Sequence, residues 1–138
     1  IAWPGQINDP VLCLIPELDM RIEKPERWHL RIVHVPAALA ARGYPPELDA
    51  ELHLAVRDAT LPANEGRFVL RVKGGRGEVT KGGRGELALD VRGLAPLYSS
   101  YLAPAQLAAI DMLAGAPAAL ATAAAIFAGP EPWMADFF

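Results

Sequence analysis

Apolar and polar side chains alternate in three stretches of the middle of the chain. Over residues 48–56, Leu52 lies on one side and His53 on the other, which is the period of a strand with one face on a core. The same alternation returns over residues 68–73 and 86–91. The pattern therefore predicts a sheet that is apolar on one face and solvated on the other.

Two glycine pairs separate these strands. Residues 73–78, Lys-Gly-Gly-Arg-Gly-Glu, recur as residues 81–86. A repeat rich in glycine and arginine suggests phosphate or RNA binding, but it matches neither the phosphate-loop pattern nor the dinucleotide fingerprint. Each copy joins two strands and precedes no helix that could hold an anion. We therefore predict hairpin turns at both pairs, and with them an antiparallel meander.

The chain before residue 48 has a less regular pattern. Residues 1–27 are punctuated by prolines and predict a connecting segment with one short buried element around residues 11–15, in which Cys13 is a small buried hydrophobe. Residues 28–35 predict a first strand, and a proline then leads into a helix over residues 37–42.

The period changes again after residue 93. Residues 94–102 predict a short helix, and Pro104 and Pro117 stand where first-turn prolines stand in two alanine-rich helices. The fold class that follows is α+β, a mostly antiparallel sheet of about five strands with helices packed on one face. The apolar faces predicted for the last two helices are Leu107, Ile110 and Leu113, and Leu120, Ala124 and Phe127.

Composition excludes several classes of function. The chain has 138 residues, a formal charge of −3 and a pI near 5.6, so we expect one domain that binds no nucleic acid. No apolar stretch reaches the roughly 18 residues of a membrane span. A single cysteine fits a reducing, cytoplasmic compartment. Because the chain opens at Ile1 and not at methionine, we expect it to be cut from a longer protein.

The three histidines do not form a recognisable metal site. His29, His34 and His53 lack ligand spacing, and no second cysteine supports them. We expect structural roles for them, with His53 solvated on the polar face of its strand, and no bound metal.

The aromatic C-terminus is the most unusual segment. Terminal residues are normally polar and frayed, yet this chain ends in Phe137 and Phe138. Two interpretations remain open from the residues alone. Either the last residue enters a pocket and carries its α-carboxylate with it, or the tail covers this domain's own core.

Three blocks of sequence carry a resemblance to a known family. Residues 31–45, 85–98 and 127–138 resemble, in that order, the C-terminal sterol-carrier-protein-like domain of bacterial Eis-type (enhanced intracellular survival) GNAT N-acetyltransferases. One departure is visible, because the first block commonly carries aspartate where this chain has His34. The resemblance assigns residues 28–138 to the sterol-carrier-protein-like domain and residues 1–27 to the end of a preceding GNAT-like region.

The resemblance also implies a function. In this family acetyl-CoA binds to a preceding GNAT-like region, and some members acetylate amines such as aminoglycosides. The chain's terminal carboxylate resembles the general base, which assigns that role to Phe138. An α-carboxyl group titrates near pH 3.5, so it would be ionised and able to accept a proton from an ammonium substrate. Its proximity to the substrate, more than its basicity, would make it useful as a base. The acetyl-CoA pattern is absent from this sequence, so we expect no cofactor here and no activity from this segment alone.

Two functions from different classes therefore remain. The first is an accessory and assembly domain whose partners are the preceding GNAT-like regions and, by resemblance, further copies in a homo-oligomer. The second is a carrier of lipid or sterol with an apolar tunnel. Alanine-rich helices weigh against the second, because short side chains let helices pack closely and leave little room for a ligand. The sequence does not name the acceptor amine.

Overall fold

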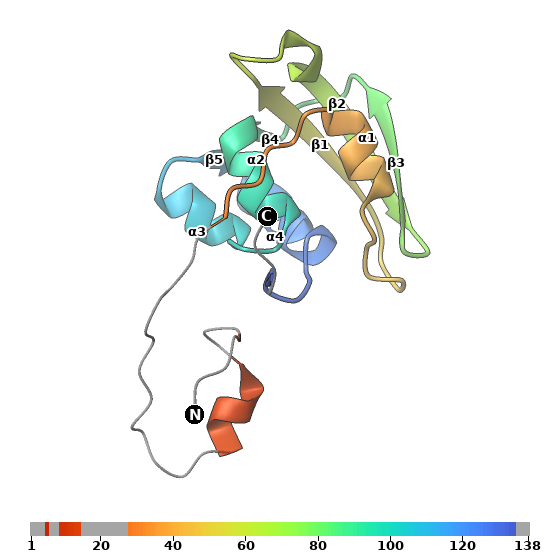
Figure 1. The fold of residues 1–138 in the computed structure, drawn as a ribbon. Coiled ribbons are helices and arrows are strands. Elements are labelled where there is room, and N and C mark those ends of the chain that lie inside the picture. The colour runs from red at the N-terminus through yellow and green to blue at the C-terminus, as the bar shows by residue number, and fades with distance from the viewer. Residues whose placement is uncertain (1–4, 6–8, 15–27, 135–138) are drawn as a thin grey trace. The chain divides into compact units, whose positions relative to one another are not determined.

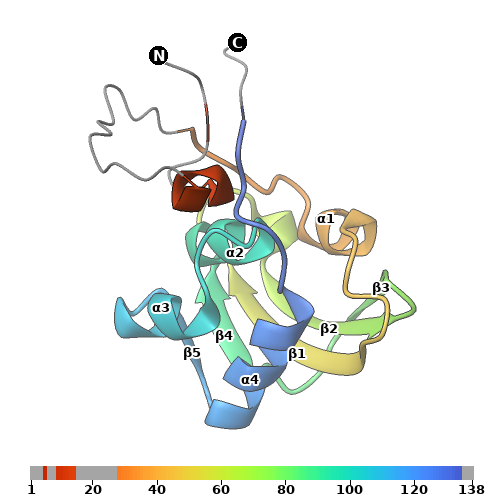
Figure 2. The ribbon, with the colours of Figure 1, turned by 90° about the horizontal axis from the view of Figure 1, so that it is seen from below.

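The computed structural model describes residue 5, residues 9–14 and residues 28–134. Contacts divide the chain into two units, residues 1–29 with 132–138, and residues 30–131. The second unit holds a five-stranded sheet with helices on one face (Figures 1 and 2). The predicted α+β class is confirmed.

The first unit contains one described element, the 3-10 helix η1 (Pro10–Leu14). Its side chains are not buried: Leu14 is 80% exposed, and Cys13 is exposed as well. The predictions of a buried element here and of a buried cysteine were therefore wrong. A 3-10 helix of five residues is too short to build an apolar core of its own.

The sheet contains one parallel pair among antiparallel ones. Its strand order is β3-β2-β1-β4-β5, and β1 and β4 run parallel while the other neighbours run antiparallel. The predicted meander holds for the first three strands only. The bounds are β1 (Asp49–Arg57), β2 (Gly66–Lys73), β3 (Arg76–Lys81), β4 (Leu87–Asp90) and β5 (Leu113–Gly115).

The alternation read from the sequence determines the face that the core occupies. Leu54 of β1 lies opposite Phe68 of β2 and beside Leu87 of β4, and all three side chains are fully buried. Their partners two residues along repeat the arrangement, so one face of the sheet is continuous apolar surface. Three helices lie on this face, α1 (Val35–Ala41), α2 (Val91–Tyr98) and α4 (Pro117–Ile126) (Figure 2).

The second glycine pair is not a hairpin turn, which corrects the prediction. Gly74 and Gly75 have φ of 55° and 77° and turn β2 into β3, as two-residue hairpins require. Gly82 and Gly83 instead begin the connection that carries the chain from the edge strand β3, past β2 and β1, to β4. The two copies of the repeat therefore have different structures.

The predicted strand over residues 28–35 is also absent. Residues 28–34 are irregular, and α1 (Val35–Ala41) begins where the strand was expected to end. His34 caps this helix, because its Nδ1 accepts a hydrogen bond from the Ala37 N–H at 3.1 Å. Side chains from a later loop supply the hydrogen bonds that a neighbouring strand would have given, as described below.

The remaining helices begin near the predicted positions. They are α2 (Val91–Tyr98), α3 (Pro104–Ala109) and α4 (Pro117–Ile126), with the short η2 (Pro62–Asn64) after β1. Pro104 and Pro117 stand in the first turns, as predicted. The predicted helical faces were only partly right, since Leu107 is buried but Ile110 is 56% exposed.

The face that α4 buries agrees only in part with the predicted one. Phe127 is buried and Leu120 packs against the core, as predicted, whereas Ala124 is exposed. The other buried residues of the helix are Ala119, Ala123 and Ile126. The helix is apolar on all sides, so no polar stripe marks its outer face. Leu113, predicted on a helix, lies instead in β5.

Candidate functional site

The described part of the C-terminal tail begins where three helices end. The predicted site residue, Phe138, lies outside the described residues, so neither its position nor that of Phe137 is known. The structure describes the start of the tail, residues 127–134, where Trp133 is 48% exposed. At this point the C-terminal ends of α1, α2 and α4 meet around Arg42.

Arg42 uses its whole guanidinium group to join these ends. The residue itself caps α1, where its backbone N–H donates to Ala38 O. Its side-chain hydrogen bonds run from Nε to Tyr98 O (2.8 Å), from Nη1 to Gly43 O (2.8 Å) and Ile126 O (3.4 Å), and from Nη2 to Ser100 Oγ (3.0 Å) and Phe127 O (3.2 Å). Helix C-termini carry partial negative charge and unpaired carbonyls, so a cation with a fork of donors fits them well.

Two aromatic rings lie next to the guanidinium group. Its central carbon lies 5.0 Å from the centroid of Tyr44 and 5.3 Å from that of Phe127, and the two rings meet edge to face at 6.4 Å. These are cation–π distances. Burial lowers the pKa of Arg42 from its ordinary value. It also raises the pKa of Tyr44 to about 12, although the Arg42 charge opposes that shift. Near neutral pH the site thus holds one charged arginine and one neutral tyrosine.

Ser100 and Gly129 lie next to Arg42 where the tail begins. Ser100, at a φ of 62°, donates from Oγ to Phe127 O at 2.9 Å while it accepts from Arg42. A Cβ built on Gly129 would lie 2.7 Å from Ser100 Oγ, so the backbone passes too close for any larger residue. A small hollow of about 170 Å³ adjoins it, lined mainly by apolar residues at and just beyond the ends of α2 and α4 and at the start of α3.

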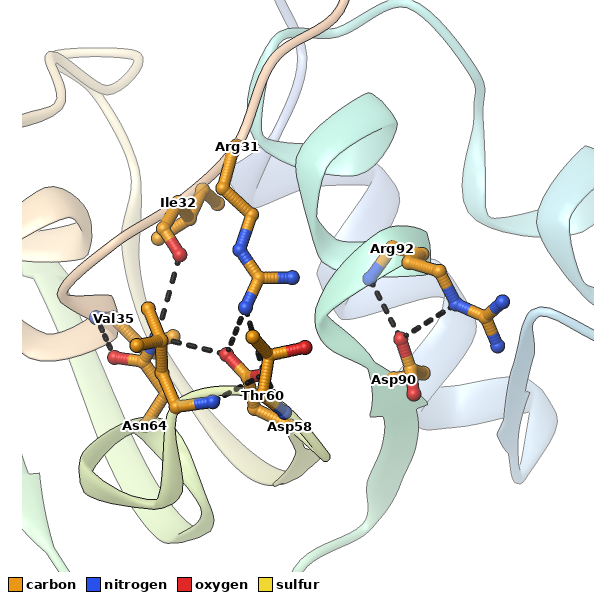
Figure 3. A network of polar contacts seen from close by, with 9 residues as sticks. Arg31, Ile32, Val35, Asp58, Thr60, Asn64, Asp90 and Arg92 are labelled. Atoms are coloured by element: carbon orange, nitrogen blue, oxygen red, sulfur yellow. Dashed lines mark hydrogen bonds and ion pairs between the residues drawn. The ribbon is translucent and has the colours of Figure 1, made fainter.

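A second polar cluster fixes the segment that enters α1 (Figure 3). The Asp58 carboxylate, directly after β1, accepts from Arg31 Nη2 at 2.7 and 2.9 Å and from Asn64 Nδ2 at 2.9 Å. Asn64 is fully buried, and its Oδ1 accepts from the Val35 N–H at 2.9 Å while its Nδ2 also donates to Ile32 O. These contacts replace a strand pairing for residues 31–35.

Hydrogen bonds govern the ionisation of Asp58. Burial of this carboxyl group raises its pKa, but the bonds from Asn64, from the Leu61 and Thr60 N–H groups and from Arg31 outweigh burial and hold the pKa well below its ordinary range. Asp90 stands nearby at the end of β4, where it caps α2 through the Arg92 N–H at 2.9 Å. That bond, against a smaller effect of burial, also lowers the pKa of Asp90.

A wider hollow of about 540 Å³ opens at this end of the sheet. Four carboxylates line it together with two arginines, Arg57 and Arg92, and with apolar residues of β4 and β5. Asp58, Glu65, Asp90 and Asp111 are the carboxylates. The mixed lining distinguishes this hollow from the mostly apolar pockets that hold small lipophilic ligands.

His53 is buried, not solvated as predicted. It is 6% exposed because the connection between β3 and β4 covers it. Its Nδ1 accepts from the Arg84 N–H at 3.0 Å, and its Nε2 lies 2.9 Å from Glu51 Oε1. A neutral ring therefore carries its proton on Nε2, so that one nitrogen accepts and the other donates. This supports the structural role predicted for this histidine.

Neither hollow suits acetyl-CoA. The smaller one is below the usual size of a ligand pocket, roughly 300–1,000 Å³. The four carboxylates around the larger one outnumber its two arginines, so its net charge is unfavourable for phosphate groups. Among the described residues, no group of three or more histidine, cysteine, aspartate or glutamate side chains could hold a metal ion. In the same part of the chain, the helices are too short or too polar to cross a bilayer.

Sequence reasoning missed Arg42, the central residue of the described site. The only local signal was an arginine directly before the glycine that ends the predicted helix, a position where basic side chains commonly meet the last carbonyls. The other two helix ends that it joins, those of α2 and α4, are 56 to 85 residues further along the chain. No local pattern could have indicated them.

Comparison with protein families gives one match, and comparison with curated proteins gives none. The model of the sterol carrier protein domain matches residues 35–135. This range includes every helix and strand of the described sheet unit.

Solved structures of N-acetyltransferases resemble the chain closely. A GCN5-related N-acetyltransferase from Anabaena variabilis ATCC 29413 is 50% identical with a TM-score of 0.93, and the match covers 97% of this chain and 34% of that one. One from Kribbella flavida is 34% identical with a TM-score of 0.76, at 97% and 35% coverage. Eis1 from Mycobacterium abscessus is 30% identical with a TM-score of 0.67, at 78% and 27%. The chain thus spans about a third of the proteins that it resembles.

Proposed function

This chain belongs to the sterol carrier protein domain family, and from that premise we propose that it is the C-terminal accessory domain of a bacterial GNAT-family N-acetyltransferase. In this role it places the terminal carboxylate of Phe138 at the acetyl-transfer site of the preceding region. The match to N-acetyltransferases over 97% of this chain but about a third of theirs carries the proposal. In this proposal acetyl-CoA binds to the preceding region, and neither hollow among the described residues suits it.

In this proposal the terminal carboxylate acts as a general base because of where it is held, and not because it is strongly basic. The acceptor amine is an ammonium ion near neutral pH and must lose a proton before its nitrogen can attack an acyl group. A terminal carboxylate, with an ordinary pKa near 3.5, is ionised under the same conditions. It accepts the proton only because it is held next to the ammonium group, which raises its effective concentration.

The alternative, a lipid or sterol carrier, finds less support. A carrier needs an apolar cavity of roughly 300 Å³ or more, whereas the apolar hollow described here has about 170 Å³ and the larger one is lined by charges. Leucine and phenylalanine side chains fill the space between helices and sheet.

The test uses the longer N-acetyltransferase that contains this chain. One glycine added after Phe138 moves the carboxylate by roughly 3.5 Å, and we expect turnover of an aminoglycoside acceptor to fall by about a hundredfold. The KM for acetyl-CoA should stay within twofold. Unchanged turnover would remove Phe138 from the mechanism. Saturable sub-micromolar binding of a fluorescent fatty acid to this chain would favour the carrier instead.

A further inference from the structure

We infer that the connection between β3 and β4, residues 82–86, is a pH-sensitive flap on the face of the sheet opposite the helices. The neutral ring of His53 holds this flap against the sheet, and protonation of the ring releases it. The inference does not depend on the function proposed for Phe138, because every residue that carries it lies in the sheet unit.

The backbone of the flap lies directly on His53. His53 and Val69 are paired across β1 and β2, and they alternate with the core residues of these strands, so both side chains point away from the helices. A Cβ built on Gly83 would lie 2.5 Å from His53 Nδ1 and 2.7 Å from Val69 Cγ2. The flap therefore contacts both side chains and buries the histidine, which is 6% exposed.

One hydrogen bond joins the middle of the flap to the sheet. The Arg84 N–H donates to His53 Nδ1 at 3.0 Å. Among the hydrogen bonds described for residues 83–85, this is the one that reaches a strand, since the Arg84 side chain bonds within the flap, to Glu86. Two of these three residues are glycines, which have no side chain to bury. The bond to the ring is therefore a large share of what holds the flap in place.

That bond requires an unprotonated Nδ1. The other ring nitrogen, Nε2, lies 2.9 Å from Glu51 Oε1. Hydrogen bonds from Arg71 and His53 hold the pKa of Glu51 below its ordinary range, so this carboxylate is ionised and keeps a proton on Nε2. A second proton must go to Nδ1, where it would point at the Arg84 N–H. Two donors cannot share one hydrogen bond, so the charged ring and the bound flap exclude one another.

The charges around the ring do not compensate for this loss. The charged side chains that lie around it on β1, on β2 and in the flap are Glu51, Arg67, Arg71, Arg84 and Glu86. Glu51 remains on β1 whether or not the flap is in place, so its attraction for the charged ring does not hold the flap. Glu86 is already paired with Arg84 at 2.7 Å. Release also lets water reach the ring, which favours its charged form. Protonation therefore shifts the population toward the released flap.

Amide hydrogen exchange of this chain, followed by NMR, tests the inference between pH 8 and pH 5, the range in which histidine normally changes charge. The ring C–H signals of His53 report its protonation. The exchange rate of the Arg84 amide, relative to its intrinsic rate at each pH, reports the bond. We expect protection of Arg84 to fall about tenfold, with the same midpoint as the ring signals. The Tyr44 amide, which donates to Gly75 O in the hairpin of the first copy of the repeat, should keep its protection.

Two variants identify the titrating group. His53→Gln has no ionisable ring, so protection of its Arg84 amide should be independent of pH, whatever its level. His29→Gln is the matched control, because His29 is exposed and lies outside the sheet unit. It should show the same fall in protection as the parent chain.

Several results would overturn the inference. The ring of His53 could titrate while Arg84 stays protected, or it could remain neutral over the whole range. Arg84 and Tyr44 could lose protection together, which would mean unfolding of the whole unit and not release of the flap. A pH dependence that persists in folded His53→Gln would assign the release to another group. Should His53→Gln fail to fold, the comparison of Arg84, Tyr44 and the ring signals in the parent chain decides alone.

Discussion

Asn64 supplies the hydrogen bonds that hold the segment entering α1. It is fully buried, and its amide accepts from Val35 and donates to Ile32 and to Asp58. A buried polar group that loses its partner costs more than the bond itself contributed, because it is then cut off from both protein and water. The Asn64 side chain thus gives this segment the backbone hydrogen bonds that a neighbouring strand would otherwise give.

We expect Asn64→Ala to destabilise the domain by about 1–3 kcal/mol, since it leaves the Val35 N–H and the Ile32 carbonyl without their partner. Chemical denaturation of this chain measures the effect. Thr60→Ala is the control, because the described contact of Thr60 with Asp58 uses its backbone N–H and not its side chain; it should stay within about 0.5 kcal/mol of the parent. Equal stability of the two variants would contradict the role of Asn64.

At the scale of elements, the connection between β3 and β4 decides the topology. It crosses the face of the sheet opposite the helices and covers His53, which accepts from the Arg84 N–H. Gly82 and Gly83 both have positive φ, 112° and 96°, so both adopt a conformation that other residues reach only with strain. They differ in the space around them.

That difference predicts unequal effects of two identical substitutions. A Cβ on Gly83 would lie 2.5 Å from His53 Nδ1 and 2.7 Å from Val69 Cγ2, whereas one on Gly82 would meet nothing within 4 Å. Gly82→Ala should cost about 1–3 kcal/mol for the backbone alone, and Gly83→Ala about 1–3 kcal/mol more for the clash. Urea denaturation of both variants measures the difference. If Gly83→Ala is no worse than Gly82→Ala, the connection does not pack on His53 as described.

The sequence predicted the elements better than their arrangement. The alternation around Leu54 and Phe68 identified strands and their buried face, because a period of two depends only on neighbouring residues. It could not distinguish the two glycine pairs, whose sequences are the same while one turns a hairpin and the other begins a crossover. Nor could it predict that residues 28–34 would bind Asn64 and Asp58 in place of a strand.

The candidate site shows the same limit. Phe138 could be proposed from the sequence because an aromatic terminus is unusual by itself, and that proposal stays untested by the described structure. Arg42 could not be proposed, since its role depends on three helix ends meeting. Periodicity also failed for α4, because a helix that is apolar on all sides does not indicate which side is buried.

For the molecule as a whole, the carboxylates of the sheet unit predict loss of stability in acid. Bonds to the ionised forms of Asp58, Asp90, Glu51 and Glu86 hold the pKa of each below its unfolded value. A group whose pKa is lower in the folded state contributes its stability fully above the unfolded pKa. That contribution is lost as the pH falls toward the folded pKa. Below about pH 4 the domain should therefore become progressively less stable.

Asp58 joins the segment that enters α1 to the end of β1, and Asp58→Asn isolates its contribution to this pH dependence of stability. Asparagine does not titrate, so the difference in unfolding free energy between the parent chain and the variant should be largest near neutral pH. It should shrink below about pH 4, where protonation weakens the parent's own contacts with Arg31 and Asn64. Denaturant titrations at several pH values give this difference directly. If this difference stays constant with pH, the pKa of Asp58 is the same in the folded and the unfolded chain, and the prediction is wrong.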